Sequence, residues 1–198
     1  FVSMLEFDDY ANRRMGMLTP AKPAKVFYFA HFDAGGSWQT FAAVINPSAG
    51  VATVTMTAYR DNGAVAGTWG PTAIAPYNKV MGFVGTDFFP GVTGIGWIRV
   101  ESDVEIIGLL NFDDYTNRMG SLSGVTPEAK FYFAHFHQDA TWQTFIAVAN
   151  PDAAATATVT LRAYSNAGGL LATRATTIGP RNRVSGLVNS SRSTTCPF

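Results

Sequence analysis

Hydrophobic and polar residues alternate along most of the chain with a period of two, which is typical of β-strands. The clearest stretch covers residues 52–60, where Val54, Met56 and Ala58 alternate with threonines. We predict that these three apolar side chains face a core and that the threonines face water. No segment shows a convincing helical period. The sequence therefore predicts an all-β protein.

Turn signals divide the chain into short predicted strands. Asp61-Asn62-Gly63 suits a hairpin turn because these residues tolerate positive φ, and glycines and a proline mark a loop over residues 85–94. The predicted strands of the first half are 25–32, 38–46, 52–60, 68–74, 78–84, 97–101 and 105–112. Those of the second half are 130–137, 141–150, 156–164, 171–178 and 182–188.

One long motif occurs twice. Residues 27–47 contain FYFAHF, WQTF and NP in that order, and residues 131–151 match them at 14 of 21 positions with a constant offset of 104. Such self-similarity predicts two domains of similar fold. Seven short strands separated by turns are typical of an immunoglobulin-like sandwich. We expect two tandem immunoglobulin-like β-sandwich repeats, over residues 25–112 and 130–198, with linkers over 8–24 and 113–129.

The second repeat is incomplete at its C-terminal end. Residues 189–198 align with the loop at 85–94, and nothing in the second copy corresponds to residues 95–105. The sequence FVSMLEFDDY at residues 1–10 aligns with IIGLLNFDDY at residues 106–115. We therefore interpret residues 1–7 as the orphan last strand of a preceding repeat.

Three explanations account for this split repeat. The chain is an excerpt of a longer repeat array, which the first residue, Phe rather than Met, also suits. Alternatively, the N-terminal strand completes the second repeat of a neighbouring molecule by addition to an open sheet edge. In the third, it folds back onto the second repeat of its own chain. Head-to-tail addition need not close and then forms filaments. The donated side chains would be Phe1, Val2, Met4, Leu5 and Phe7.

Composition limits the classes of partner. Lys and Arg total 14, Asp and Glu total 14, and charged residues make up only 14% of the chain. The basic patch of a nucleic-acid binder is missing, so nucleic acid is excluded as a main partner. No segment approaches the ~20 apolar residues of a membrane-spanning helix. The single cysteine, Cys196, allows no disulfide framework within the chain.

Two groups of side chains are candidate metal ligands. The histidines of an HxH pair project from one face of a strand, and acidic pairs in both linkers could hold Ca²⁺ together with loop carbonyls. The alternatives are a structural role for the histidines, and loop capping by the aspartates with pairing to Arg13 or Arg118. No other cofactor is expected. The candidate ligands are Asp8, Asp9, Asp113, Asp114, His135 and His137.

Aromatic residues suggest a second kind of binding. Trp38 and Trp142 could stack on the sugar rings of a polysaccharide, and core packing is the alternative. No GxSxG elbow, Walker loop, GxGxxG after a strand or HExxH is present, so we do not expect an enzyme.

The repeated motif FYFAHF…WQTF…NP, with GWIRVES at residues 96–102, resembles a poorly characterised family of β-sandwich repeats in secreted and cell-surface bacterial proteins. The resemblance implies an extracellular, non-catalytic role. We therefore expect a secreted structural protein that assembles head to tail with copies of itself, into a filament or surface layer, by donating its N-terminal strand. The alternative is a carbohydrate-binding or adhesive module of a longer cell-surface protein.

Overall fold

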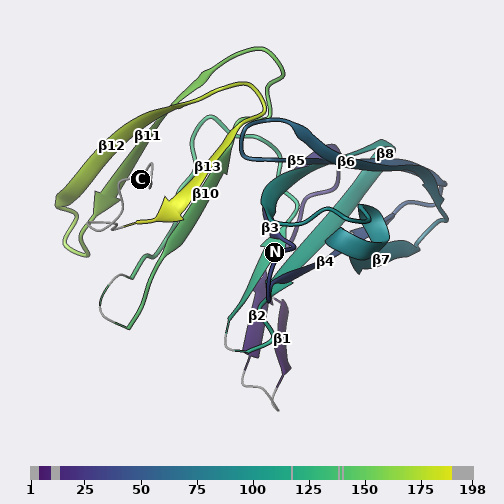
Figure 1. Ribbon diagram of the computed structural model, residues 1–198, viewed down its shortest axis with the longest axis horizontal. Coiled ribbons are helices and arrows are strands. Elements are labelled where there is room, and N and C mark those ends of the chain that lie inside the picture. Colours follow the sequence, from purple (N-terminus) through teal and green to yellow (C-terminus); the bar gives the residue numbers. More distant parts are fainter. Residues whose placement is uncertain (1–4, 10–13, 117, 138, 140, 189–198) are drawn as a thin grey trace. The chain divides into compact units, whose positions relative to one another are not determined.

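The computed structural model describes residues 5–9, 14–116, 118–137, 139 and 141–188. The chain divides into two compact units, unit 1 with residues 1–60 and 65–127, and unit 2 with residues 61–64 and 128–198. Strands make up most of unit 1, and the regular elements described in unit 2 are all strands (Figure 1), which confirms the all-β prediction. Among the described residues, no helix has the length and apolar composition needed to cross a membrane.

Unit 1 contains a curled antiparallel sheet built around one long strand, β8 (Ile95–Asp113). The first half of β8 pairs with β3 and β5, and its second half pairs with β4 and β9 (Figure 1). β6 and β7 lie outside β5 and β4. These partners are β3 (Ala24–Asp33), β4 (Gln39–Ile45), β5 (Ala52–Tyr59), β6 (Val65–Ile74), β7 (Lys79–Phe83) and β9 (Met119–Ser123).

The strands predicted for the first repeat are confirmed, with two corrections. We expected separate strands over 97–101 and 105–112, but both ranges belong to β8. β8 continues without a break while its neighbours change from one pair of strands to another. The loop expected over 85–94 contains a single turn of π-helix, η1 (Val84–Phe88), in which Phe89 N donates to Val84 O at 2.9 Å.

The core of unit 1 lies between the two halves of the curled sheet. The predicted alternation in β5 is confirmed, because Val54, Met56 and Ala58 are fully buried while the threonines between them are exposed or half-buried. Burial of this kind contributes about 1.5–3 kcal/mol for each large apolar side chain. The largest buried side chains of this core are Phe27, Phe29, Phe32, Met56, Ile98, Ile106 and Leu110.

Unit 2 contains shorter elements, β10 (Phe145–Ala149), β11 (Ala157–Tyr164), β12 (Leu170–Ile178) and β13 (Arg183–Leu187). β10 pairs with β13, and β11 pairs with β12, as two separate two-stranded sheets. The strand predicted over 130–137 is wrong, because this segment forms no strand. In unit 1 its counterpart, β3, takes its strand hydrogen bonds from β8, and the described residues of unit 2 include no counterpart of β8.

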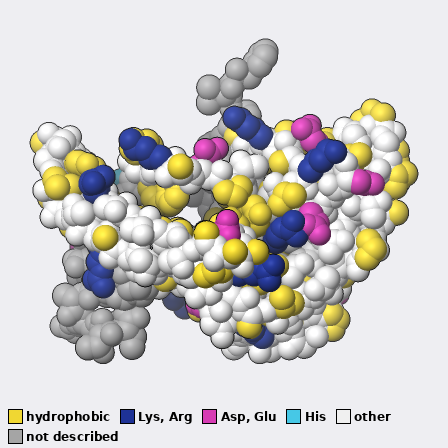
Figure 2. All heavy atoms as spheres, turned by 90° about the horizontal axis from the view of Figure 1, so that it is seen from above, with side chains coloured by type: hydrophobic (Ala, Val, Ile, Leu, Met, Phe, Trp, Pro, Cys, Tyr) yellow, Lys and Arg dark blue, Asp and Glu magenta, His cyan; other side chains and the backbone are white. Residues whose placement is uncertain are grey.

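The N-terminal residues form a hairpin of β1 (Leu5–Asp9) and β2 (Arg14–Leu18). The stretches expected to be linkers therefore include β2 and β9. Beside them, Ser123 Oγ donates to Thr19 O at 2.6 Å, which joins the end of β9 to the residue after β2. On the face shown in Figure 2, charged side chains of both signs are scattered among uncharged surface.

Candidate functional site

The threonine of the repeated WQT motif closes the same loop in both units. The Oγ1 atom of Thr40 donates to Asp33 O at 2.5 Å and accepts from Asp33 N at 2.9 Å. Thr144 repeats both bonds with the backbone of His137, at 2.8 Å and 2.9 Å. The motif threonine therefore fixes the turn before β4 and before β10, a role that the sequence analysis did not assign.

The asparagine of the repeated NP motif joins the ends of three backbone segments. Asn46 is fully buried, and its Nδ2 donates to the carbonyls of residues 50, 74 and 75 at 2.7, 3.0 and 3.2 Å. Asn150 makes the same contacts with residues 155, 178 and 179 at 2.8, 3.0 and 3.0 Å. A polar residue that recurs inside an apolar motif is the sequence signal that could have revealed this role.

The β1–β2 hairpin reproduces the hairpin made by the end of β8 and β9. Leu5 pairs with Leu18 and Phe7 with Gly16, and the corresponding pairs in unit 1 are Leu110 with Leu122 and Phe112 with Gly120. The two hairpins share this register from the leucine pair to the last pair before the turn. That last pair is Asp9 with Arg14 in the first hairpin and Asp114 with Arg118 in the second. The interpretation of the N-terminal strand as the last strand of a repeat thus extends to a whole hairpin.

The described residues of unit 2 leave one side of β10 without a strand neighbour. β10 pairs with β13 as β4 pairs with β7. In unit 1 the other side of β4 pairs with β8, from Gln39 opposite Asp113 to Ile45 opposite Ile107. In β-sheet proteins, the edge of a strand is the usual place where an extended segment of another chain adds to a sheet.

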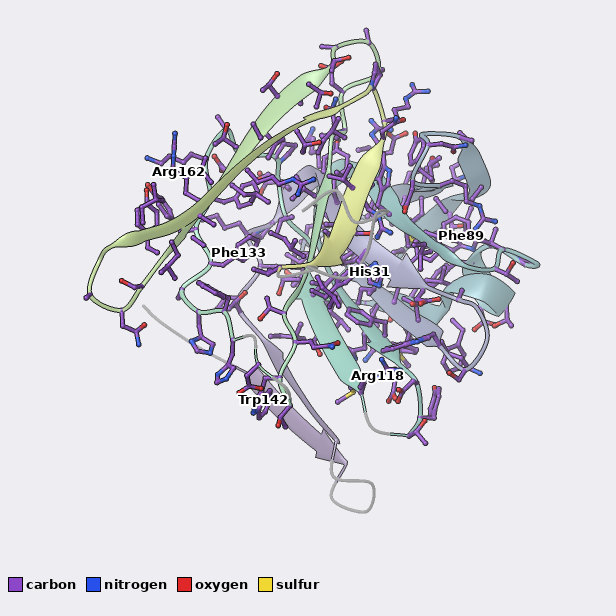
Figure 3. The ribbon with its side chains drawn as sticks, turned by 60° about the vertical axis from the view of Figure 1, so that its left-hand side comes forward. His31, Phe89, Arg118, Phe133, Trp142 and Arg162 are labelled. Atoms are coloured by element: carbon purple, nitrogen blue, oxygen red, sulfur yellow. The ribbon has the colours of Figure 1, made fainter. Side chains whose placement is uncertain are left out.

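Aromatic side chains that form the core of unit 1 are exposed in unit 2. The phenylalanines of the FYFAHF motif are almost completely buried in β3, where they pack against β8. Their counterparts precede β10 in coil, and Phe133 and Trp142 are labelled on this segment in Figure 3. The exposed fractions are 1%, 0% and 0% for Phe27, Phe29 and Phe32, against 48%, 64% and 37% for Phe131, Phe133 and Phe136.

The two tryptophans proposed for sugar stacking lie in different surroundings. Trp38 is half-buried, with its ring 5.9 Å from that of Phe112 and the Arg118 guanidinium 4.9 Å from its ring centroid. His31, which is buried, packs edge-on against the same phenylalanine at 4.8 Å. Trp142 is 63% exposed. The covering residues Phe112 and Arg118 belong to the β8–β9 hairpin.

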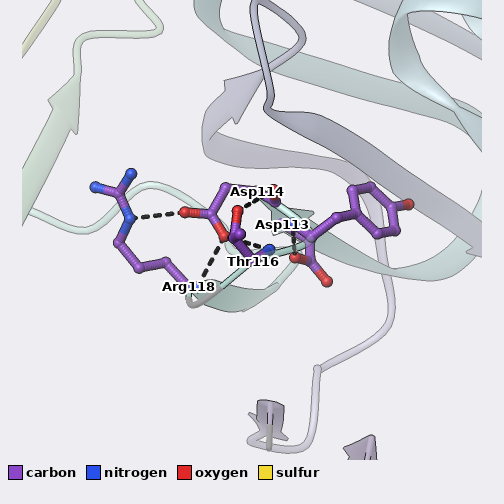
Figure 4. Close-up of polar contacts among 5 residues, drawn as sticks. Asp113, Asp114, Thr116 and Arg118 are labelled. Carbon is purple, nitrogen blue, oxygen red and sulfur yellow. Dashed lines mark hydrogen bonds and ion pairs between the residues drawn. The ribbon is translucent and has the colours of Figure 1, made fainter. Parts of the chain in front are cut away.

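The second acidic pair proposed as a metal site organises the β8–β9 turn (Figure 4). The Oδ1 atom of Asp114 accepts from the backbone N–H groups of Thr116 at 3.0 Å and Arg118 at 2.9 Å, and its Oδ2 accepts from Arg118 Nε at 2.8 Å. Asp113 accepts from Tyr115 N at 2.5 Å. These are the loop-capping contacts and the arginine pairing of the alternative interpretation. The side chains of Asp8 and Asp9 lie outside the described part of the structure.

The histidines proposed as metal ligands lie in the coil before β10. His137 Nε2 lies 2.8 Å from Asp139 Oδ2, and the ring centroids of His135 and His137 are 6.3 Å apart. Hydrogen bonds from the backbone N–H groups of Trp142 and Thr141, and then from His137, lower the pKa of Asp139 to about 2. Within the described ranges, no three His, Cys, Asp or Glu side chains form a group arranged to hold a metal ion.

The proposed assembly strand is described only in part. Phe1, Val2 and Met4 lie outside the described residues, whereas Leu5 and Phe7 belong to the backbone of β1. For these two residues the structure gives the backbone pairing.

Comparisons with known proteins add little. No protein-family model matches the chain, and no curated protein matches it. It is similar to a solved structure titled "Crystal Structure of Thermotoga maritima 1070", with a TM-score of 0.43 and 13% identity over 56% of this chain and 100% of that chain. We draw no functional conclusion from this similarity.

Proposed function

We propose that the protein is an extracellular structural protein whose copies assemble head to tail, into a filament or surface layer, by donating the N-terminal hairpin to unit 2 of a neighbour. The observation that carries this proposal is the common register of the β1–β2 and β8–β9 hairpins. The hairpin has the backbone form that unit 1 uses beside β4, and β10 offers the corresponding edge.

The pairing of β4 with β8 predicts the register of the donated strand. In unit 1, Phe41 lies opposite Asn111 and Ala42 opposite Leu110. Substituting the aligned residues places Glu6 opposite Phe145 and Leu5 opposite Ile146. β10 of one molecule would then lie between its own β13 and β1 of the neighbour, which hydrogen-bonds both edges of β10.

The donated hairpin also carries the residues needed to cover Trp142. Phe7 occupies the position of Phe112, and Arg14 occupies the position of Arg118. In unit 1 these two positions lie against the ring of Trp38. Burying a largely exposed tryptophan would contribute strongly to assembly, because aromatic anchors dominate the energetics of many interfaces.

The remaining parts of the proposal rest on the sequence. We propose that each completed repeat is an immunoglobulin-like sandwich, with the two halves of β8 contributing to opposite layers. The resemblance of the repeated motif to β-sandwich repeats of secreted and cell-surface bacterial proteins supports a bacterial origin and an extracellular location. The low content of charged side chains suits a protein that covers its surface by association.

Engineered disulfides test the assembly and its register together. Glu6→Cys and Phe145→Cys are combined in one chain that also carries Cys196→Ser, and the products of mild oxidation are separated by denaturing electrophoresis. We expect a ladder of covalent oligomers, and negative-stain microscopy of the native protein should show filaments. The control replaces Phe145→Cys with Ile146→Cys, because adjacent residues of a strand point to opposite faces.

The outcomes separate the explanations of the split repeat. A ladder that the control lacks supports donation between molecules. A cross-linked monomer would place the hairpin on unit 2 of its own chain. Monomers without cross-links, and no filaments at any protein concentration, would refute donation.

A second function is favoured by the exposure of Trp142, which suits a carbohydrate-binding or adhesive module. A polysaccharide would stack on this ring and on neighbouring aromatic residues. Trp142→Ala would then abolish retention on a glycan affinity column. Retention that is unchanged in this variant, or absent from the native protein, would argue against glycan binding.

A further inference from the structure

The N-terminal strand corresponds to only one half of β8. It aligns with residues 106–113, and that half of β8 pairs with β4 and β9. The other half, residues 95–102, pairs with β3 on one side and β5 on the other. The described residues of unit 2 contain the counterparts of both these neighbours, the segment 131–136 and β11, but no strand between them. Within the described parts of the chain, donation of the hairpin supplies no strand for this second position.

The second edge is lined by apolar side chains that a strand would bury. Phe131 and Phe133 are 48% and 64% exposed. On the β11 side, Val159 and Leu161 are only partly buried, although their counterparts Val54 and Met56 in β5 are completely buried against β8. Apolar side chains are therefore available on both neighbours of the missing strand, the segment 131–136 and β11.

On the opposite face of these two neighbours, unit 2 carries positive charges where unit 1 carries uncharged residues. Arg162 takes the place of Thr57, and Lys130 takes the place of Val26. A hydrogen bond with Tyr132 raises the pKa of Lys130, and the charge of Arg162 acts against this. In Figure 3, Arg162 is labelled on β11 and Phe133 on the coil that precedes β10.

We propose that this edge binds an extended segment of another polypeptide chain, which lies antiparallel between residues 131–136 and β11. The segment has the pattern glycine, any residue, isoleucine or valine, an acidic residue, and valine or isoleucine. The site is distinct from the edge of β10, and the proposal does not depend on head-to-tail assembly.

The register of β8 specifies each position of the pattern. A Cβ atom on Gly96 would clash with the carbonyl oxygen of Tyr59 and with the ring of Phe32, so the first position must be glycine. Ile98 and Val100 lie opposite Phe29 and Phe27 and are completely buried, so the third and fifth positions must be apolar.

The fourth position distinguishes the partner of unit 2 from β8 itself. In unit 1 this position is Arg99, which lies opposite Thr57. In unit 2 the facing residue is Arg162, and like charges directly opposite each other are destabilising. An acidic residue would instead face Arg162. The next outward position, Glu101 in β8, lies opposite Val26 and would face Lys130 in unit 2, so a second acidic residue is also favourable there.

Labelled peptides with the sequence of residues 94–103 test the site against the full-length protein by fluorescence anisotropy. We expect the Arg99→Glu peptide to bind about tenfold more tightly than the unmodified peptide, and the Gly96→Ala peptide about tenfold more weakly. All these substitutions are in the peptide, so they leave the folding of the protein unchanged. Absence of saturable binding, or equal binding of the three peptides, would overturn the proposal.

A cross-linking experiment tests the position of the peptide. The protein carries Arg162→Cys and Cys196→Ser, and the peptide carries Arg99→Cys. We expect a disulfide here and none with Leu161→Cys, whose side chain points to the opposite face. Equal cross-linking at both positions would place the peptide elsewhere.

Full-length protein with Leu5→Asp distinguishes this proposal from hairpin donation. The substitution places a charge in the donated strand and should abolish assembly. Peptide affinity should stay within about twofold of the native value, since it depends on a different edge. A parallel loss of peptide binding and assembly would show that the two edges are not separate sites.

Discussion

Replacement of Asn46 by alanine tests the role of the repeated NP motif. The side chain has no exposed surface, and its Nδ2 group donates to three backbone carbonyls while its Oδ1 accepts from Ser48 N and Ser48 Oγ at 3.0 and 2.7 Å. Asn46→Ala removes all five contacts, and the buried carbonyl of Ile74 loses this donor. Gly50 O still accepts from Ser48 Oγ at 3.1 Å, and Ala75 O still accepts from Asn78 N at 3.2 Å.

The size of the effect follows from these contacts. Each hydrogen bond contributes about 1 kcal/mol net, and an unsatisfied buried group costs about 1–3 kcal/mol. The two hydrogens of Nδ2 are shared among three carbonyls, so the contacts are not independent. We expect Asn46→Ala to lower the free energy of unfolding of unit 1 by about 2–4 kcal/mol.

Urea unfolding followed by tryptophan fluorescence measures this change, with separate transitions fitted for the two units. Asn78→Ala is the matched control, because Asn78 is exposed and its Oδ1 only accepts from Lys79 N at 2.8 Å. We expect the control to lose less than about 0.5 kcal/mol. Asn150→Ala should weaken the transition of unit 2 instead.

Two results would refute this reasoning. A loss below about 1 kcal/mol for Asn46→Ala would show that the buried hydrogen bonds are replaceable. Equal losses for Asn46→Ala and Asn78→Ala would show that the effect belongs to asparagine in general rather than to the buried contacts.

Three further predictions follow from other contacts. Thr40→Val keeps the side-chain shape but removes both bonds to the backbone of Asp33, so unfolding should become easier by about 1–2 kcal/mol, and no change in the urea midpoint would contradict this. The carboxyl group of Asp139 should titrate with a pKa of about 2 in an NMR pH series. Its contribution to stability is therefore present above about pH 4, near the ordinary pKa of an aspartate, and is lost as the pH falls towards 2. An ordinary pKa for Asp139 would refute the described loop. Ser3 aligns with Gly108, where an added Cβ would lie 2.6 Å from the ring of the core residue Phe27. Ser3→Gly should therefore strengthen head-to-tail assembly in sedimentation experiments. Weaker assembly would contradict the proposed register.

Several features of the candidate site were accessible from the sequence, and others were not. The alignment of residues 1–10 with 106–115 identified the counterpart of the second half of β8, because identical residues at a fixed spacing need no structural information. The roles of Thr40 and Asn46 required coordinates, since both bind backbone atoms that an alignment does not specify. Whether Asp114 caps a turn or holds a cation likewise depends on which N–H groups face its carboxylate.

The sequence by itself determined the all-β class, the repeat and the alternation within β5, because these depend on local periodicity and composition. Only the tertiary structure decided which apolar segments become strands. Residues 27–32 and 131–136 are both FYFAHF, yet the first lies in β3 and the second forms no strand. A strand takes its hydrogen bonds from neighbours that are distant in sequence, and β8 is the neighbour that unit 1 has and the described residues of unit 2 lack.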